Sequence, residues 1–213
     1  GKRKLVDSKI IEIVAGPNGS GKTTFAESYL LRTKRNLVFL NPDLIASGIG
    51  PLDFEKASFQ AGRVLISEIK SRIERQESFA FESTLSGRTF ARLLSEAANR
   101  DYQIVIYFIF LNSIEKNLKR IKKRVQLGGH NIPKAAVLRR QPRCFENFWN
   151  LYRPLTRDWY IFDNSDNKPN LISSKSEFES ASPKARDKFS ADFLKGKLYG
   201  RKQNKQTLKD IKA

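Results

Sequence analysis

The sequence contains one cysteine, one histidine and no methionine. The single cysteine, Cys144, excludes an intramolecular disulfide and a cysteine-rich zinc site, and it fits a reducing compartment. Long apolar runs are also absent, since the longest one, Ile104 to Leu111, is too short to cross a bilayer. No segment has the basic start, apolar stretch and small-residue cleavage site of a signal peptide. We therefore expect a soluble, cytoplasmic protein with no membrane partner.

Acidic residues are scarce relative to basic ones, and the imbalance is uneven along the chain. The formal net charge is +18, from 40 lysines and arginines against 22 aspartates and glutamates. Residues 119–143 contribute nine basic residues and no acidic one, which is half of the excess. Residues 173–213 contribute eleven basic residues and five acidic ones. Such an excess of basic residues predicts a positively charged surface and anionic partners, namely nucleotide phosphates, nucleic acid or acidic proteins.

Hydrophobic periodicity predicts alternating strands and helices over most of the chain. The predicted strands are residues 10–15, 37–40, 79–81, 103–111 and 159–162, and the predicted helices are 22–31, 53–76, 88–98, 113–125 and 133–152, the last interrupted near Pro142. This order predicts an α/β protein with a central parallel sheet and helices on both faces. We expect one domain over residues 1–172, followed by residues 173–213 as a basic tail or a short helical appendage.

A phosphate-binding loop follows the first predicted strand and opens the first predicted helix. Residues 16–23 match the pattern G-x-x-x-x-G-K-[ST] in full, in the strand–loop–helix context that the pattern requires. Its glycines let backbone N–H groups turn toward phosphate oxygens, and the helix start adds positive potential. The lysine reaches the β- and γ-phosphates of ATP, and the threonine hydroxyl ligates Mg²⁺. The predicted ATP-binding residues are Gly16, Pro17, Asn18, Gly19, Ser20, Gly21, Lys22, Thr23 and Thr24, with Thr23 as the magnesium ligand.

The phosphate-binding loop does not by itself identify what receives the phosphate. The apolar strand that ends in aspartate, typical of large ATPase machines, is missing, because the strand at 103–111 is followed by Asn112 and Ser113. The chain is also short for a mechanical ATPase. We therefore expect a compact phosphotransferase, which needs a base near the acceptor hydroxyl and positive charge around the transferred phosphoryl group.

Asp43 follows the strand at 37–40, at the sheet edge where open parallel sheets bind ligands. Three interpretations apply to it. It can belong to a helix start, with Asn41 as N-cap and Pro42 at the first helical position. It can also be a metal ligand, or the base that removes a proton from the acceptor. The helix-start role is compatible with the role of base.

Glu82 has the same relative place after the strand at 79–81. Hydroxyl side chains and Arg88 follow it, which is a poor composition for packing and a suitable one for binding a polyhydroxylated ligand. A capped loop before the helix at Arg88 explains the same residues. The candidate substrate-binding residues are Glu82, Thr84, Ser86 and Arg88.

The basic stretch at 119–143 surrounds "GGHNIP", residues 128–133, and resembles a mobile lid over a triphosphate. Arginines on such a lid can neutralise transition-state charge and exclude water. The candidates are Arg124, Arg139 and Arg140, and the alternative is a solvated basic helix face. His130 is the only histidine, and a structural role is the more common one for such a residue.

Several motifs in one order resemble the zeta toxin family in its short bacterial form. They are "AGPNGSGKTTFA", "NPDLIA", "AGR", "SFAFESTLSGRT", "GGHNIP", the Arg139–Arg140 pair and "NFWNLYRPL", and the resemblance covers about residues 8–172. It implies a P-loop kinase that uses ATP and Mg²⁺ to phosphorylate the 3′-hydroxyl of the sugar in UDP-N-acetylglucosamine. It also implies an antitoxin protein that covers the nucleotide site.

The same resemblance implies roles for individual residues. Lys22 matches the phosphate-binding lysine and Asp43 the general base, while Arg124 and one of Arg139 or Arg140 match the lid arginines. Glu82 and Thr84 match contacts to the sugar nucleotide. The chain departs from the family where Ser86 replaces a substrate arginine, with Arg88 two residues later, and where Lys134 and Gln141 replace an acid and an aromatic residue.

Two other functions compete with a sugar-nucleotide kinase. The charge of +18 favours a nucleic-acid-associated enzyme such as a polynucleotide end kinase, but the chain shows no recognisable motif for binding RNA or DNA. The other alternative is a non-catalytic module that binds ATP and a partner protein.

Overall fold

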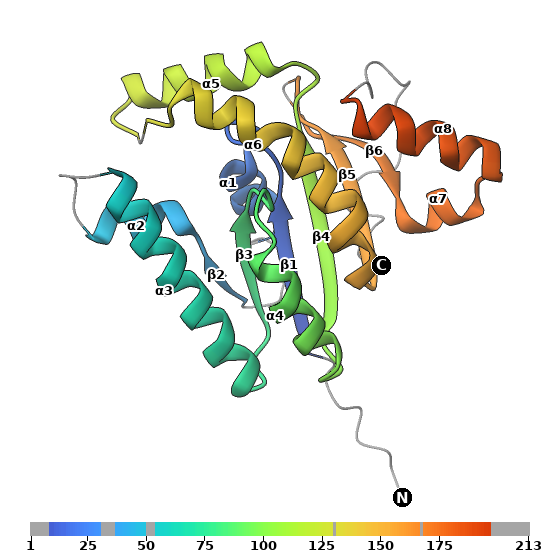
Figure 1. The fold of residues 1–213 in the computed structure, drawn as a ribbon, viewed down its shortest axis with the longest axis horizontal. Coiled ribbons are helices and arrows are strands. Elements are labelled where there is room, and N and C mark those ends of the chain that lie inside the picture. Colours follow the sequence, from blue (N-terminus) through green and yellow to red (C-terminus); the bar gives the residue numbers. More distant parts are fainter. Residues whose placement is uncertain (1–8, 31–36, 50–53, 130, 167, 197–213) are drawn as a thin grey trace, which may run out of the picture.

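The computed structural model describes residues 9–30, 37–49, 54–129, 131–166 and 168–196 (Figure 1). Its centre is a six-stranded sheet with the order β2-β3-β1-β4-β5-β6. The strands are β1 (Ile10–Ala15), β2 (Val38–Leu40), β3 (Phe79–Ser83), β4 (Gln103–Phe110), β5 (Asp158–Asp163) and β6 (Asn170–Ser174). The first five strands are parallel, which confirms the predicted fold class.

The sixth strand corrects the sequence prediction, which ended the sheet at residue 162. β6 pairs antiparallel with β5, at the edge of the sheet. This strand is only five residues long, with the sequence NLISS, so its two apolar residues give little of the signal that marks the central strands. A single antiparallel edge strand on an otherwise parallel sheet is common in α/β folds.

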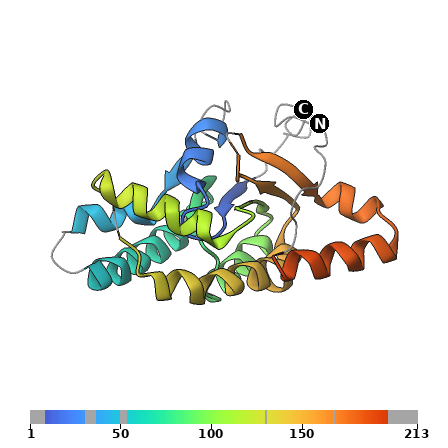
Figure 2. The ribbon, with the colours of Figure 1, turned by 90° about the horizontal axis from the view of Figure 1, so that it is seen from above.

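Helices cover both faces of the sheet, as the alternating pattern predicted (Figure 2). On one face lie α3 (Phe54–Glu74), α4 (Thr89–Ala98), α6 (Lys134–Asn147) and α8 (Pro183–Leu194), and on the other lies α1 (Lys22–Phe25) with its π-helical continuation Ala26–Leu30. The remaining helices are α2 (Pro42–Ile49), α5 (Ile114–Gln126) and α7 (Lys175–Ser180). None of the described helices is long and apolar enough to span a membrane.

The strand β4 is buried along almost its whole length, because helices pack on both of its sides. On the face that carries α6, its residue Phe108 stacks on Phe148, with ring centroids 4.5 Å apart. Phe193 of α8 meets the edge of the same Phe108 ring at 5.4 Å. The segment after residue 173 therefore contributes helices and core residues in its described part, up to residue 196.

The segment predicted as one helix at 133–152 is helical, but the α-helix changes to other helical turns at a different residue than predicted. α6 runs through Pro142 to Asn147, a π-helical turn follows at Phe148–Tyr152, and a 3-10 turn follows at Arg153–Leu155. The wide turn places Phe148, Trp149 and Tyr152 in the core. The interruption thus lies after Asn147 rather than at Pro142.

Candidate active site

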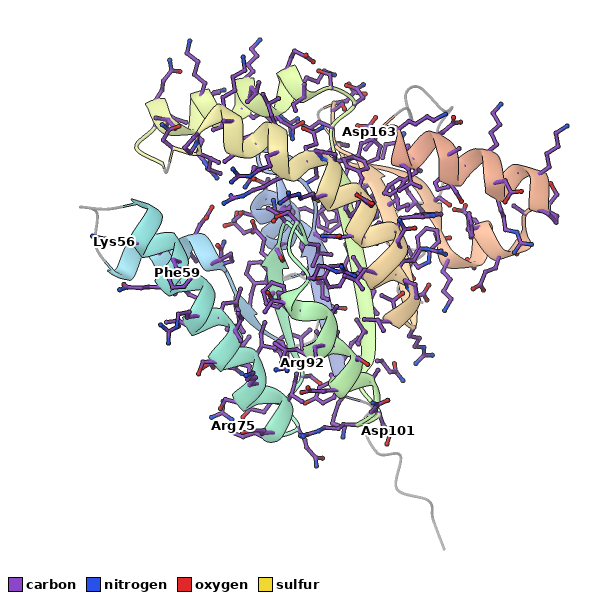
Figure 3. All side chains as sticks on the ribbon, viewed as in Figure 1. Lys56, Phe59, Arg75, Arg92, Asp101 and Asp163 are labelled. Atoms are coloured by element: carbon purple, nitrogen blue, oxygen red, sulfur yellow. The ribbon has the colours of Figure 1, made fainter. Side chains whose placement is uncertain are left out.

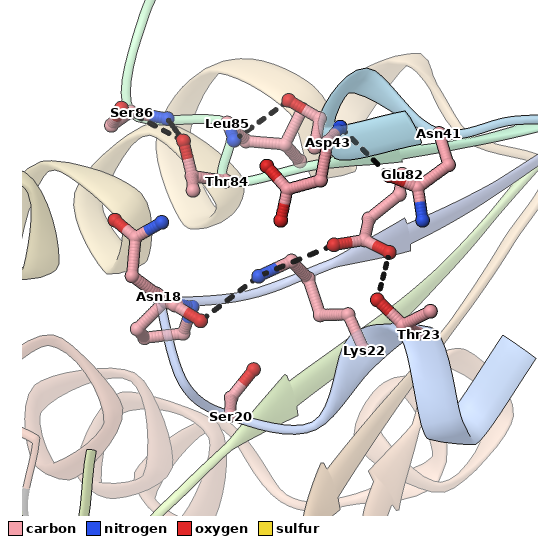
Figure 4. Close-up of polar contacts among 12 residues, drawn as sticks. Asn18, Ser20, Lys22, Thr23, Asn41, Asp43, Glu82, Thr84, Leu85 and Ser86 are labelled. Atoms are coloured by element: carbon pink, nitrogen blue, oxygen red, sulfur yellow. Dashed lines mark hydrogen bonds and ion pairs between the residues drawn. The ribbon is translucent and has the colours of Figure 1, made fainter. Parts of the chain in front are cut away.

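The phosphate-binding loop joins β1 to α1 at the carboxyl end of the sheet (Figures 1 and 4). Three of its glycines, Gly16, Gly19 and Gly21, have positive φ angles of 145°, 76° and 90°, which other residues rarely adopt. A Cβ atom at Gly16 would also collide with the backbone carbonyl of Ile109 on the neighbouring strand β4. The glycines of the motif are therefore required both by backbone conformation and by close packing.

Lys22 and Thr23 meet the same carboxylate, that of Glu82 at the end of β3 (Figure 4). The Thr23 hydroxyl donates to Glu82 Oε2 at 2.8 Å, and Lys22 Nζ lies 3.9 Å from Glu82 Oε1. Lys22 also donates to the Pro17 carbonyl at 3.0 Å. Parallel pairing puts Glu82 level with Val14 of β1, which brings it beside the loop that follows.

Glu82 is almost completely buried, and this affects its ionisation. Burial raises the pKa of Glu82, because the charged form loses water, while the Lys22 ammonium and the Thr23 hydroxyl oppose that rise. The Thr23 hydroxyl and the Glu82 carboxylate offer two oxygen atoms 2.8 Å apart, and oxygen is the ligand atom that Mg²⁺ prefers. This pair fits a magnesium ion bound also by phosphate oxygens and water.

Asp43 lies across the mouth of the site from the phosphate loop. Its carboxylate Oδ2 is 3.3 Å from Arg124 Nη1 of α5, and both side chains are partly exposed. The backbone N–H of Asp43 donates to Asn41 Oδ1 at 2.8 Å, which confirms Asn41 as the N-cap of α2. Since capping uses the backbone of Asp43, its carboxylate is left to serve in the site.

The hydroxyl-rich segment after Glu82 lines another side of the site (Figure 4). Thr84 Oγ1 and Ser86 Oγ are hydrogen-bonded at 2.9 Å, and Leu85 between them has a positive φ of 53°. Asn147 holds the turn by donating to the Leu85 carbonyl at 3.0 Å. Arg88 is exposed at the start of α4.

The basic hairpin of α5 and α6 lies above the carboxyl ends of the central strands in Figure 1. Side chains with nitrogen tips extend from the outer side of α5, away from the sheet (Figure 3). On α6, Arg140 lies three residues after the buried Val137 and four before the buried Cys144, so it shares their inward side. Arg139 is exposed and points to the opposite side of the helix. His130 lies outside the described residues.

Sequence reasoning missed three polar residues around the phosphate loop. Asn117 donates to the Asn18 carbonyl at 2.8 Å, Asn164 donates to the Ser20 carbonyl at 2.8 Å, and Arg120 donates to the Asn164 carbonyl at 2.7 Å. Asn164 directly follows β5, so the strand-end rule that singled out Asp43 and Glu82 would have found it. Asn117 and Arg120 lie inside an amphipathic helix, where no local pattern distinguishes them.

The family model described as "Zeta toxin" matches residues 3–168. A Haemophilus influenzae protein described as "Uncharacterized protein" is 34% identical over 122 residues, which cover 57% of this chain and 85% of that protein.

Solved structures show the same fold at low sequence identity. A structure from the PezAT chromosomal toxin–antitoxin system of Streptococcus pneumoniae has a TM-score of 0.57 at 13% identity, over 93% of this chain and 91% of that one. The AvrRxo1-ORF1:-ORF2 complex with ATP has a TM-score of 0.65 at 15% identity, over 92% and 66% of the two chains. The Pnkp1/Rnl/Hen1 RNA repair complex has a TM-score of 0.56 at 19% identity, over 81% and 51%.

Proposed function

We propose that this chain, which belongs to the zeta toxin family, is an ATP-dependent kinase that phosphorylates a sugar hydroxyl of UDP-N-acetylglucosamine or a related nucleotide-sugar. The observation that carries the proposal is the position of the Asp43 carboxylate. It faces the phosphate loop from the opposite side of the site and lies 3.3 Å from the lid residue Arg124. A base opposite a phosphate cradle is the arrangement that in-line transfer to a hydroxyl needs.

The reaction follows from these positions. ATP binds with its phosphates in the loop, where the backbone N–H groups and Lys22 hold the β- and γ-phosphates. Asp43 accepts the proton of the acceptor hydroxyl as that oxygen bonds to the γ-phosphorus. The bond from the γ-phosphorus to the β–γ bridging oxygen breaks, and ADP leaves. The products are ADP, the phosphorylated acceptor and a proton.

Several other side chains complete the site. Thr23 and Glu82 would hold a magnesium ion, which supplies positive charge to the phosphates when it is bound. The Arg124 guanidinium contacts the Asp43 carboxylate. From this place near the base, it neutralises the negative charge that develops on the transferred phosphoryl group. Thr84 and Ser86 present hydroxyls for the sugar, and Arg88 is placed at the rim for a charged part of the acceptor.

The acceptor is tested directly by product analysis. Purified protein is incubated with ATP, Mg²⁺ and either UDP-N-acetylglucosamine, UDP-glucose or an oligonucleotide with free 5′-hydroxyl ends, and products are identified by mass spectrometry. We expect a gain of one phosphate on the sugar nucleotides alone. Phosphorylation of the oligonucleotide alone would overturn the proposed acceptor in favour of a polynucleotide kinase, and no phosphorylation with ATP bound would favour the non-catalytic module.

Family membership also supports the proposal of a protein partner. Toxins of this type are paired with antitoxins, and the similar structures include one from a toxin–antitoxin system. We propose that an antitoxin covers the nucleotide site of this chain. Competition between a candidate antitoxin and the ATP analogue AMP-PNP, measured by calorimetry, tests this, and simultaneous binding of both would contradict it.

Replacing Arg124 with alanine should slow phosphoryl transfer far more than it weakens nucleotide binding. A lid arginine stabilises charge that is present mainly in the transition state, and one such donor is worth about a hundredfold in rate. The check is kcat for transfer together with the Kd for AMP-PNP. An Arg124→Ala variant that lost only nucleotide affinity would make this arginine a ground-state contact.

The two neighbouring arginines of α6 should differ in effect. Arg140 shares the inward side of the helix, whereas Arg139 is exposed on the opposite side. We therefore expect Arg140→Ala to reduce kcat by about tenfold or more, and Arg139→Ala, the matched control, to have a much smaller effect. The reverse order would show that α6 rotates or shifts when the site is occupied.

A further inference from the structure

The backbone of the phosphate loop poses a hydrogen-bonding problem. Its N–H groups can face a phosphate only if its carbonyl groups face outward, and a carbonyl group in a protein interior needs a donor. Two of these carbonyls accept from asparagine side chains that come from distant parts of the chain. Asn117 Nδ2 donates to the Asn18 carbonyl and Asn164 Nδ2 to the Ser20 carbonyl, each at 2.8 Å.

Both connections lead to the same helix, α5. Asn117 is part of α5, and Asn164 is held by α5 because Arg120 Nη2 donates to the Asn164 carbonyl at 2.7 Å. Asn117, Arg120 and Arg124 follow each other at spacings of three and four residues, so they lie along one side of the helix. That side therefore touches the phosphate loop at one end and Asp43 at the other.

The glycines of the loop are placed where these contacts are tightest. A Cβ atom at Gly19 would lie 2.6 Å from the backbone oxygen of Asn117, and one at Gly21 would lie 2.5 Å from Asn164 Nδ2. Both distances are shorter than real Cβ contacts, so glycine lets the loop approach the backbone of α5 at position 19 and the Asn164 side chain at position 21. Hydrogen bonds and close glycine contacts thus both indicate that Asn117 and Asn164 are fixed against the phosphate loop. We call this set of contacts the junction.

The side chain of Asn117 is itself unusual for a buried position. It is 0% exposed, and its Oδ1 has no hydrogen-bond partner among the described residues. An unpaired buried oxygen is unfavourable, and an apolar side chain of the same size would avoid it. The amide is therefore retained for its N–H donor, and that donor serves the phosphate loop.

We propose that Asn117 is a positioning residue, which fixes the first half of α5 to the phosphate loop and thereby sets Arg124 relative to the γ-phosphate and Asp43. The inference rests on the proposed function, since it assigns Arg124 to the transferred phosphoryl group. The first turns of α5, which carry Asn117 and Arg120, are thus tied to the phosphate loop directly and through Asn164.

The test uses two substitutions that remove the donor and nearly keep the volume. Asn117→Asp places a carboxylate oxygen against the Asn18 carbonyl, and Asn117→Leu leaves that carbonyl unpaired without adding charge. We expect the affinity for AMP-PNP·Mg²⁺ to fall about tenfold or more in the aspartate variant and less in the leucine variant. Val137→Ala, in the apolar cluster between α5 and α6, is the control that lowers stability without touching the loop.

A double-mutant cycle separates positioning from simple structural support. Hydrolysis of ATP by water, read as released inorganic phosphate, is measured for wild type, Asn117→Leu, Arg124→Ala and the double variant. If Asn117 acts through Arg124, the leucine substitution slows hydrolysis in the wild-type background and adds little in the Arg124→Ala background. Equal slowing in both backgrounds, or no change in either binding or hydrolysis, would overturn the proposal.

These readouts do not depend on the acceptor. If the wild type fails to phosphorylate UDP-N-acetylglucosamine, the proposed acceptor is wrong, while the hydrolysis cycle still reports on Asn117. If the wild type does not hydrolyse ATP at all, binding of AMP-PNP·Mg²⁺ decides instead. Wild-type affinity in both Asn117 variants would then show that the junction has no effect on the phosphate loop.

Discussion

Replacing Asp43 with asparagine is expected to lower phosphoryl transfer to UDP-N-acetylglucosamine by roughly two or more orders of magnitude, because the positioned base is lost. AMP-PNP·Mg²⁺ should still bind, since Lys22, Thr23 and the loop amides are unchanged. The fold should also persist, because α2 is capped by the Asn41 side chain on the backbone N–H of residue 43, which asparagine retains. The decisive measurement pairs transfer kinetics with calorimetry on the wild type and the variant.

The same variant separates the three roles that the sequence left open. If Asp43 served only the helix start, the change would cost well under about 1 kcal/mol of stability and leave transfer almost intact. If it bound the metal, the affinity for AMP-PNP·Mg²⁺ would fall together with the rate. Loss of its contact with Arg124 adds little, because both side chains are partly exposed and such pairs are weak.

Replacing Lys22 with alanine is expected to abolish ATP turnover, with a loss of about a hundredfold or more. Lys22 is buried, and its ammonium group lies between the Pro17 carbonyl and the Glu82 carboxylate, at the position from which it can reach the β- and γ-phosphates. No other side chain of the loop carries a positive charge. The substitution also leaves Glu82 buried without its ion-pair partner, so thermal unfolding must be followed in parallel.

A matched control keeps this result interpretable. Lys119 is an exposed lysine on the outer part of α5, and Lys119→Ala should leave turnover near the wild-type value. A Lys22→Ala protein that folds, binds AMP-PNP·Mg²⁺ and retains more than a small fraction of turnover would contradict the assignment of the phosphate-binding motif. Titration of the same variant with AMP-PNP·Mg²⁺ shows whether the lysine also supports binding of the ground state.

Much of the fold and part of the site could be predicted from short stretches of the sequence. Apolar runs and helical periodicity predicted the five parallel strands, and the glycine–lysine–threonine pattern predicted the phosphate loop. The N-cap at Asn41 was predicted correctly from three adjacent residues. These features depend on interactions between near neighbours in the chain, so a local pattern is sufficient to reveal them.

The contact between Glu82 and Thr23 could not be predicted from local patterns in the sequence. No carboxylate follows the long strand β4, which is succeeded by Leu111, Asn112 and Ser113. The sheet order places β3 beside β1, so the carboxylate that meets Thr23 comes from the end of β3 instead. Similarly, β6 was missed because an edge strand with polar residues carries little periodic signal.

The sequence by itself determined the fold class, the phosphate loop and an acid near the carboxyl end of each of two strands, although β3 runs through Glu82 to Ser83 rather than ending before it. Only the tertiary structure decided which groups meet: Thr23 with Glu82, Arg124 with Asp43, Asn117 with Asn18, and Asn164 with Ser20. These partners are separated by 59, 81, 99 and 144 residues. Contacts at such separations depend on strand order and on the angle of a packed helix, which arise from the packing of the whole core and leave no trace in any short segment.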